Sequence, residues 1–193
     1  MRHIELNNEI TQMADGFYQL EKDQEALQEF LKEARENTLP FSNVRERIAY
    51  MMEQDYYYNV LQEYSLEEIE EVYATTYEEN FQFQSYMAVS KFYKDYALKT
   101  NDGKQYLESY EERIAIVSLY LGRGNAEKAK KYAQQMIKQN YQPATPTFLN
   151  AGRSRRGEMV SCFLLEMDDS LNSIGFNINT AMQLSKIGGG VNQ

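Results

Sequence analysis

The sequence contains very little cysteine, proline, histidine or tryptophan. Its 193 residues include one cysteine, three prolines, one histidine and no tryptophan. One cysteine excludes an intramolecular disulfide framework and fits a reducing cytosol. The single histidine, His3, has no neighbours at metal-ligand spacing. We therefore expect His3 to be a surface side chain, and we expect no metal site.

Long apolar runs and positive charge are also scarce. No apolar run approaches the length of a membrane span, and the first residues do not resemble a signal peptide. Asp and Glu number 29 against 20 Lys and Arg, which gives a formal net charge of -9. Binding to nucleic acid needs clustered Lys and Arg, so this balance argues against it. The composition predicts a soluble, acidic, cytoplasmic protein with neither a nucleic-acid nor a membrane partner.

Helical periodicity dominates the chain up to about residue 141. Helices are predicted over Lys22–Arg35 and Val44–Met52, after the capping box of Ser65 and Glu68, from Tyr110 to a stop at Gly122, and after the cap residue Asn125. Before them, Ile4–Leu6 and Phe17–Leu20 are predicted to be short strands joined by a tight turn at Asp15 and Gly16. The dense tyrosines at 56–58 are explained most simply by packing on amphipathic helices rather than by nucleotide stacking.

The pattern changes near Tyr141, where we place a domain boundary between residues 1–141 and 142–193. Pro143 and Pro146 disfavour helical geometry in the residues before them. Thr145 and Thr147 are therefore expected on a stiff loop with free hydroxyl groups. A basic turn, Arg153-Ser-Arg-Arg156-Gly157, follows.

A nearly continuous apolar run from Glu158 to Glu166 predicts a strand buried on both faces, as in α/β sheets or barrels. Ser161 and Cys162 are its reactive groups. Asp168, Asp169 and Ser170 can cap the next helix, which Gly188 can close as a left-handed cap.

Taken alone, these residues do not specify an enzyme. Cys162 fits a small core hydrophobe, because buried thiols are usually inert. Asp169 fits a helix cap. The three glycines at 188–190 follow a helix rather than joining a strand to one, so they match neither the P-loop nor the dinucleotide fingerprint.

Several long runs, however, resemble one family. The runs Thr145–Gly152 (TPTFLNAG), Gly157–Glu166 (GEMVSCFLLE) and Gln183–Val191 (QLSKIGGGV) resemble the start of the catalytic barrel in the large (α) subunit of class Ib ribonucleoside-diphosphate reductase. Phe92–Asn101 (FYKDYALKTN) and Tyr110–Ile114 (YEERI) resemble that family's N-terminal helical domain. The resemblance implies a mostly α fold, in which the helical domain precedes the first strand and helix of a ten-stranded α/β reductase barrel.

The resemblance also implies roles for individual residues. Cys162 matches a strand cysteine that is oxidised to a disulfide as the ribose 2′-hydroxyl is replaced by hydrogen, and that takes part in hydrogen transfer. Thr145, Ser161 and Gly190 match positions that hold the ribonucleoside diphosphate. Asp169 matches a contact to the specificity effector, a nucleoside triphosphate at the interface of an α homodimer. A helix over Leu171–Ile187 is expected to help build that interface.

The family's chemistry implies partners rather than a cofactor bound by this chain. A radical would come from a dimetal small (β) subunit, and reducing equivalents from a thioredoxin- or glutaredoxin-type redoxin. The second redox cysteine and the radical-bearing cysteine belong to later parts of the family pattern. We therefore expect the isolated chain to be inactive without the C-terminal portion of the α subunit, and its open barrel edge to favour association. Two other interpretations stay open, a non-catalytic nucleotide-binding or interaction module and a truncated remnant.

Overall fold

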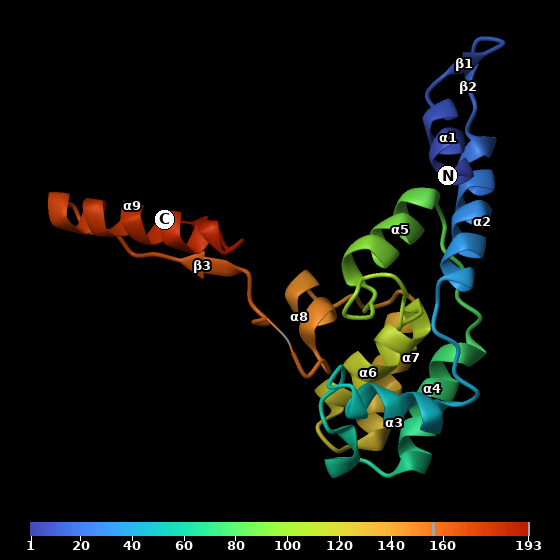
Figure 1. Ribbon diagram of the computed structural model, residues 1–193. Helices are drawn as coiled ribbons and strands as arrows, with labels where there is room; N and C mark the ends of the chain where they lie inside the picture. Colours follow the sequence, from blue (N-terminus) through green and yellow to red (C-terminus); the bar gives the residue numbers. More distant parts are fainter. Residues whose placement is uncertain (156, 193) are drawn as a thin grey trace.

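The computed structural model describes residues 1–155 and 157–192, and most of them are helical (Figure 1). Arg156 of the predicted basic turn and Gln193 lie outside the described residues. The elements in chain order are α1 (Arg2–Glu9), β1 (Met13–Ala14), β2 (Phe17–Tyr18), α2 (Glu21–Glu36), α3 (Val44–Glu53), a 3-10 turn η1 (Val60–Gln62), α4 (Leu66–Glu78), α5 (Tyr86–Lys91), a π-helical turn η2 (Phe92–Tyr96), α6 (Tyr110–Gly122), α7 (Ala126–Ile137), α8 (Thr145–Asn150), β3 (Cys162–Leu164), α9 (Leu171–Lys186) and β4 (Gly190–Asn192). The predicted mostly helical fold is confirmed.

Helix α6 is the centre of the helical body. It packs against α4 and α7, and nearly every side chain from Tyr110 to Tyr120 is buried. The sequence predicted one apolar stripe, but a helix that is apolar on almost all sides is buried all round. At its end, a Cβ on Gly122 would lie 2.9 Å from the Cβ of Ala129, so glycine lets α6 approach α7 closely.

Local helix signals are confirmed in the body. Ser65 and Glu68 form the predicted capping box at the start of α4, and Ser109 and Glu112 form a second one at α6. The Asn125 side chain accepts a hydrogen bond from the Lys128 amide and caps α7. The tyrosines at 56–58 do pack, since Tyr57 is buried and the ring of Tyr58 meets that of Tyr120 edge to face. They lie between α3 and η1, however, and not on a helix as predicted.

The N-terminal prediction was wrong in two respects. Ile4–Leu6 is part of helix α1 rather than a strand, and His3 is buried rather than on the surface. His3 and Leu6 are three residues apart, so in a helix both side chains face α2. There the His3 Nδ1 lies 3.2 Å from the Glu33 Oε2. The turn at Asp15 and Gly16 is confirmed, although its strands are two residues each.

Near residue 145 the predicted loop is also wrong, because Thr145 opens helix α8 and Thr147 lies within it. Pro146 occupies the first turn of α8, where its missing N–H would have no helical partner in any case. Proline therefore starts this helix rather than preventing it.

The last elements form a β-α-β unit, β3-α9-β4, which extends to one side of the helical body in Figure 1. The strands are parallel, with Cys162 opposite Gly190. Ser170 caps α9 by accepting from the Ser173 amide, and Gly188 closes it with φ +87°, as predicted. Strand β4 follows directly, in addition to the strand and helix that were expected.

The predicted strand over Glu158–Glu166 was too long and too buried. Strand β3 covers Cys162–Leu164, and the side chain of Leu164 is 82% exposed. In the described part of the chain, β3 pairs with β4 and with no second strand. Burial on both faces needs covering elements, and the apolar run alone does not supply them. Across residues 1–155 and 157–192, none of the helices combines the length and apolar character needed to cross a membrane.

Candidate functional site around Cys162

The β3-β4 pairing brings three of the predicted site residues together. The Gly190 amide donates to the Ser161 carbonyl oxygen at 2.6 Å. The Ser161 hydroxyl oxygen lies 4.0 Å from the Cys162 Sγ. Parallel pairing also sets Cys162 opposite Gly190. The thiol of Cys162, the hydroxyl of Ser161 and the bare backbone of Gly190 therefore lie next to one another.

Two neighbouring glycines of the 188–190 run differ in whether a Cβ would fit at their position. A Cβ on Gly189 would lie 2.6 Å from the Phe163 ring, so packing requires glycine there. A Cβ on Gly190 would meet the Ser161 oxygen at 3.4 Å and the Cys162 Sγ at 4.0 Å, which are ordinary contacts. A Cβ at Gly190 would therefore contact the Ser161 oxygen and the Cys162 sulfur without clashing with them.

Cys162 is a free thiol, and its side chain is exposed. The interpretation of Cys162 as a buried core residue is therefore wrong. A thiol that solvent and ligands can reach is able to react as a nucleophile or a redox group.

Thr145 lies apart from these residues, at the start of α8 beside the helical body (Figure 1). Its hydroxyl group is 3.2 Å from the hydroxyl of Tyr96, the last residue of η2. No hydrogen bond links Thr145 to Ser161 or Cys162 in the parts of the chain that the structure describes. The structure thus groups Ser161, Cys162 and Gly190, and sets Thr145 in a second location.

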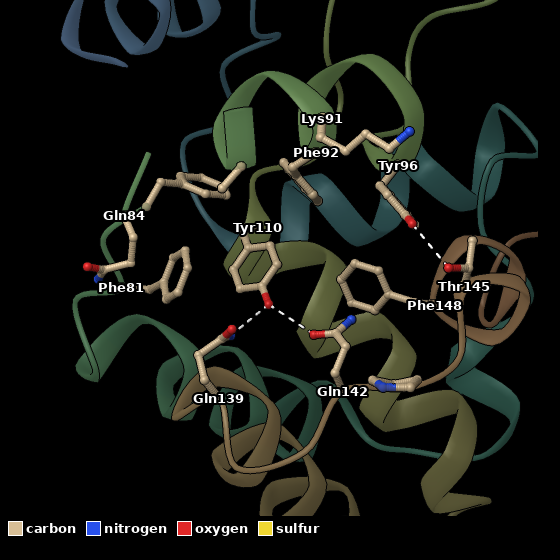
Figure 2. A pocket seen from close by; sticks show the side chains of 13 residues that line it. Phe81, Gln84, Lys91, Phe92, Tyr96, Tyr110, Gln139, Gln142, Thr145 and Phe148 are labelled. Carbon is tan, nitrogen blue, oxygen red and sulfur yellow. Dashed lines mark hydrogen bonds between the residues drawn. The ribbon is translucent and has the colours of Figure 1, made fainter. Parts of the chain in front are cut away.

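Figure 2 shows that second location, a cavity of about 380 Å³ between η2, α6 and α8. Six of the thirteen residues that line it are aromatic, among them Phe92, Tyr110 and Phe148. The Tyr110 hydroxyl accepts from Gln139 Nε2 at 2.8 Å and lies 3.4 Å from Gln142 Oε1. Burial raises the pKa of Tyr110, so its hydroxyl stays a neutral donor and acceptor.

A second feature of the helical body is an ion cluster, which we define as Glu108, Arg113 and Arg153 and call the buried ion cluster. The Glu108 Oε1 accepts from Arg113 Nη1 at 3.0 Å, and its Oε2 accepts from Arg153 Nη2 at 3.3 Å. Burial would raise the pKa of Glu108. The two guanidinium groups, together with hydrogen bonds from the Leu98 amide and the Tyr57 hydroxyl, outweigh burial and hold that pKa below the ordinary value. Burial lowers the pKa of Arg113 in spite of Glu108.

The ion cluster fixes the segment that leads out of α8. Arg113 Nη2 donates to the Ala151 carbonyl oxygen. The Tyr58 amide donates to the Gly152 carbonyl oxygen at 3.1 Å, and the Ser154 amide to that of Tyr56 at 3.0 Å. Residues 152–154 therefore pair with residues 56–58 of the helical body.

Gly152 itself is required at this point. Its φ is +79°, and a Cβ would lie 2.8 Å from the Ile116 Cγ1. Just before it, the Asn150 side chain accepts from the Gly157 amide at 3.0 Å and donates to the Glu158 oxygen at 3.0 Å. These contacts hold both ends of the basic turn.

Asp169 lies in the exposed turn before α9, where Ser170 rather than Asp169 caps the helix. Among the described residues, no group of three or more His, Cys, Asp or Glu side chains is arranged to hold a metal ion.

Comparison with known proteins accounts for nearly the whole chain. Consecutive family models match residues 3–81 (ribonucleotide reductase N-terminal), 82–156 (ribonucleotide reductase, all-alpha domain) and 160–192 (ribonucleotide reductase, barrel domain). The chain belongs to the ribonucleotide reductase large-subunit family. The family resemblance seen in the sequence is thereby confirmed, and Ser161, Cys162, Asp169 and Gly190 lie in the barrel-domain match.

Relatives in this family are highly similar over the matched region. The α subunit of ribonucleoside-diphosphate reductase from Bacillus subtilis is 55% identical over 190 residues, which are 97% of this chain and 27% of that subunit. The NrdEB α subunit of Bacillus phage SPbeta is 53% identical over 97% of this chain and 18% of that protein. The Mycoplasma pneumoniae α subunit is 46% identical over 88% of this chain and 24% of its own length. The chain thus spans about a quarter or less of these reductase subunits.

Sequence reasoning did not identify Tyr96, Glu108 or Arg153 as parts of the cavity and the ion cluster. Tyr96 and Glu108 look like ordinary residues of a polar helical domain, and Arg153 looks like part of a basic turn. No spacing links the three because tertiary packing brings them together. A charged residue inside a helical domain gives no signal of its own until its burial is known.

Proposed function

We propose that this chain forms the N-terminal part of a class Ib ribonucleotide reductase, which converts ribonucleoside diphosphates to deoxyribonucleoside diphosphates for DNA synthesis in the cytoplasm. It acts together with the remaining sequence of the α subunit, on the same polypeptide or on a second one. By itself it does not complete the reaction, because the oxidation of two thiols to a disulfide needs a second cysteine and the sequence holds one.

The reaction removes the ribose 2′-hydroxyl group. That group leaves as water, a hydrogen takes its place on the carbon, and two thiols lose two hydrogens in total and become a disulfide. Cys162 is one of the two thiols and delivers hydrogen to the sugar. The second thiol comes from the remaining α-subunit sequence, and a redoxin returns the disulfide to two thiols.

The observation that carries this proposal is the juxtaposition of Cys162 with Ser161 and Gly190. An exposed thiol beside a hydroxyl, opposite a backbone position that carries no side chain, can receive a sugar and hydrogen-bond it. The barrel-domain match over residues 160–192 and the names of the similar reductases support the same reaction.

The other residues take supporting roles in the proposal. The Thr145 and Ser161 hydroxyl groups hold the diphosphate or ribose, and closure of the barrel brings α8 and β3 to one substrate. Asp169, exposed before α9, contacts a nucleoside triphosphate effector at an α-homodimer interface built partly by α9. The radical is supplied by a dimetal β subunit rather than by groups of this chain.

A chimera tests the proposal directly. Residues 1–192 replace the matched region of the Bacillus subtilis α subunit, and the product is assayed with its β subunit, a redoxin and a ribonucleoside diphosphate. The chimera is expected to form deoxyribonucleoside diphosphate, and Cys162→Ser is expected to abolish product formation, since serine cannot donate hydrogen and form a disulfide. The matched control is Ser42→Ala, which removes an exposed hydroxyl group far from Cys162 in the sequence and is expected to keep activity.

Two results would contradict the proposal. One is a folded chimera that makes no product while the parent Bacillus subtilis subunit is active. The other is full product formation by Cys162→Ser. Either would favour a non-catalytic module, which calorimetry of the chain with deoxyadenosine nucleotides would then detect as binding.

A further inference from the structure

We propose that Tyr96 is a substrate-positioning residue, which orients the Thr145 hydroxyl group for the diphosphate and is itself held by the buried ion cluster. This inference rests on the proposed function and extends it from the barrel into the helical domain. Its basis is a continuous set of contacts from Glu108 through Arg153 and Tyr96 to Thr145.

The first step is the contact between the two hydroxyl groups. Tyr96 Oη and Thr145 Oγ1 are 3.2 Å apart, and Figure 2 shows the two side chains pointing toward each other at the rim of the cavity. A threonine hydroxyl has one proton and can also accept. When Tyr96 donates to Thr145, the Thr145 proton is free to point at an anionic phosphate oxygen. Either hydroxyl can donate in this contact, and an anionic phosphate beside Thr145 favours the arrangement in which Tyr96 donates to Thr145 and Thr145 donates to the phosphate.

The second step is the fixed position of Tyr96. The residue ends the π-helical turn η2, a rare local structure that occurs frequently at functional sites. Arg153 Nη2 donates to the Tyr96 carbonyl oxygen and also to the Glu108 carboxylate. One guanidinium group therefore ties the end of η2 to the buried carboxylate.

The third step is that the same cluster also fixes Thr145. Arg113, held by Glu108, donates to the carbonyl oxygen of Ala151, the residue after α8. Tyr96 and the helix that carries Thr145 are thus both connected to the fully buried Glu108, the first through Arg153 and the second through Arg113. A common rigid support keeps two side chains from different elements in register.

The contact itself is tested on the chain as it stands, by NMR of a threonine-labelled sample. Three-bond couplings of Thr145 report whether its χ1 angle occupies one rotamer. One rotamer is expected in the unmodified chain, and averaging over rotamers in Tyr96→Phe. Tyr141→Phe removes a hydroxyl from an exposed tyrosine and leaves the Thr145 couplings unchanged. Unchanged couplings in Tyr96→Phe would overturn the inference.

The role in catalysis is tested in the chimera described above. Tyr96→Phe is expected to raise KM for the ribonucleoside diphosphate about fivefold, the usual effect of one hydrogen bond, with kcat changed by less than about twofold. In a Thr145→Val background the same Tyr96→Phe change is expected to have no further effect, because Tyr96 acts through the Thr145 hydroxyl. Thr145→Ser keeps the hydroxyl and restores the sensitivity to Tyr96→Phe.

Additive effects of Tyr96→Phe and Thr145→Val would overturn the inference, as would a loss in kcat alone. Thr75→Val, which deletes a threonine hydroxyl on α4 that bonds its own helix, is the matched control and leaves KM unchanged. If the unmodified chimera is inactive, the proposed function fails and the positioning role fails with it. The NMR couplings still establish separately whether the hydroxyl contact exists.

Discussion

Helices α6 and α9 differ in almost every respect except the way they begin. A serine caps each of them and accepts a hydrogen bond from the amide three residues later. Yet α6 is buried over nearly its whole length, whereas Asn177 is the buried residue of α9, and Phe176 is 70% exposed. A cap and a helical repeat are local signals, and they are enough to specify a helix. Whether the helix is buried depends on the elements packed around it.

The strongest way to break the helical body is to remove the charge at its centre. Glu108→Gln leaves Arg113 and Arg153 without a counter-charge, so we expect a loss of about 4 kcal/mol in the free energy of unfolding. Urea titration followed by circular dichroism measures it. Glu29→Gln, an exposed carboxylate on α2, should stay within about 0.5 kcal/mol of the unmodified chain. Equal stabilities of the two variants would contradict a structural role for the ion cluster.

The next test compares one apolar residue from each region. Leu119→Ala opens a cavity in the core at α6, and its expected cost is about 3 kcal/mol. Phe176→Ala deletes a larger side chain from α9, yet it should change the free energy of unfolding by less than about 0.5 kcal/mol because the ring is exposed. The same urea titration applies. A large cost for Phe176→Ala would mean that α9 is covered in solution.

The pH dependence of stability distinguishes two carboxylates within the body. The folded-state pKa of Glu108 lies below its ordinary value of 4.5, so its contribution is full above that pH and is lost as the pH falls through the folded-state pKa. Burial raises the pKa of Glu112 in spite of Arg47, so its contribution is present below 4.5 and is lost as the pH rises. The stability difference between the unmodified chain and Glu108→Gln should therefore grow from about pH 4 to about pH 7, and that for Glu112→Gln should shrink. The same trend for both variants would contradict these assignments.

The smallest expected effect is at the cap of α9. Ser170→Ala removes the side-chain acceptor for the Ser173 amide, and we expect a local cost of about 1 kcal/mol to α9. Hydrogen exchange of the α9 amides should accelerate by about fivefold, while exchange in α6 stays unchanged. Faster exchange in both α6 and α9 would show instead that the two regions unfold as one unit.

Much of the helical body could be predicted from the sequence because its signals are local. The capping box at Ser65, the cap at Asn125 and the turn at Asp15 and Gly16 depend on residues a few positions apart. His3 and Ile4–Leu6 were predicted wrongly because a short run with apolar residues at alternate positions fits a strand as well as a helix. Packing against α2 decided the outcome.

Of the candidate site, the sequence predicted the residues but not their surroundings. The strand at Cys162 was identified, whereas its exposure was not, because an apolar run does not reveal what covers it. Thr145 was assigned to a loop because of Pro146, although proline is equally suited to the first turn of a helix. Tyr96 and Glu108 could not be assigned at all, since their contacts reach residues 49 and 45 positions away.

The pairing of Cys162 with Gly190 also fixes the number of residues that the chain between them can contain. Side chains alternate from face to face along a strand, so the thiol and the bare position coincide in a single alignment of β3 and β4. Deleting one of the three glycines would bring Val191 level with the sulfur, and a branched side chain would then fill the gap beside it. For the proposed reaction, the length of the glycine run therefore matters as much as the cysteine.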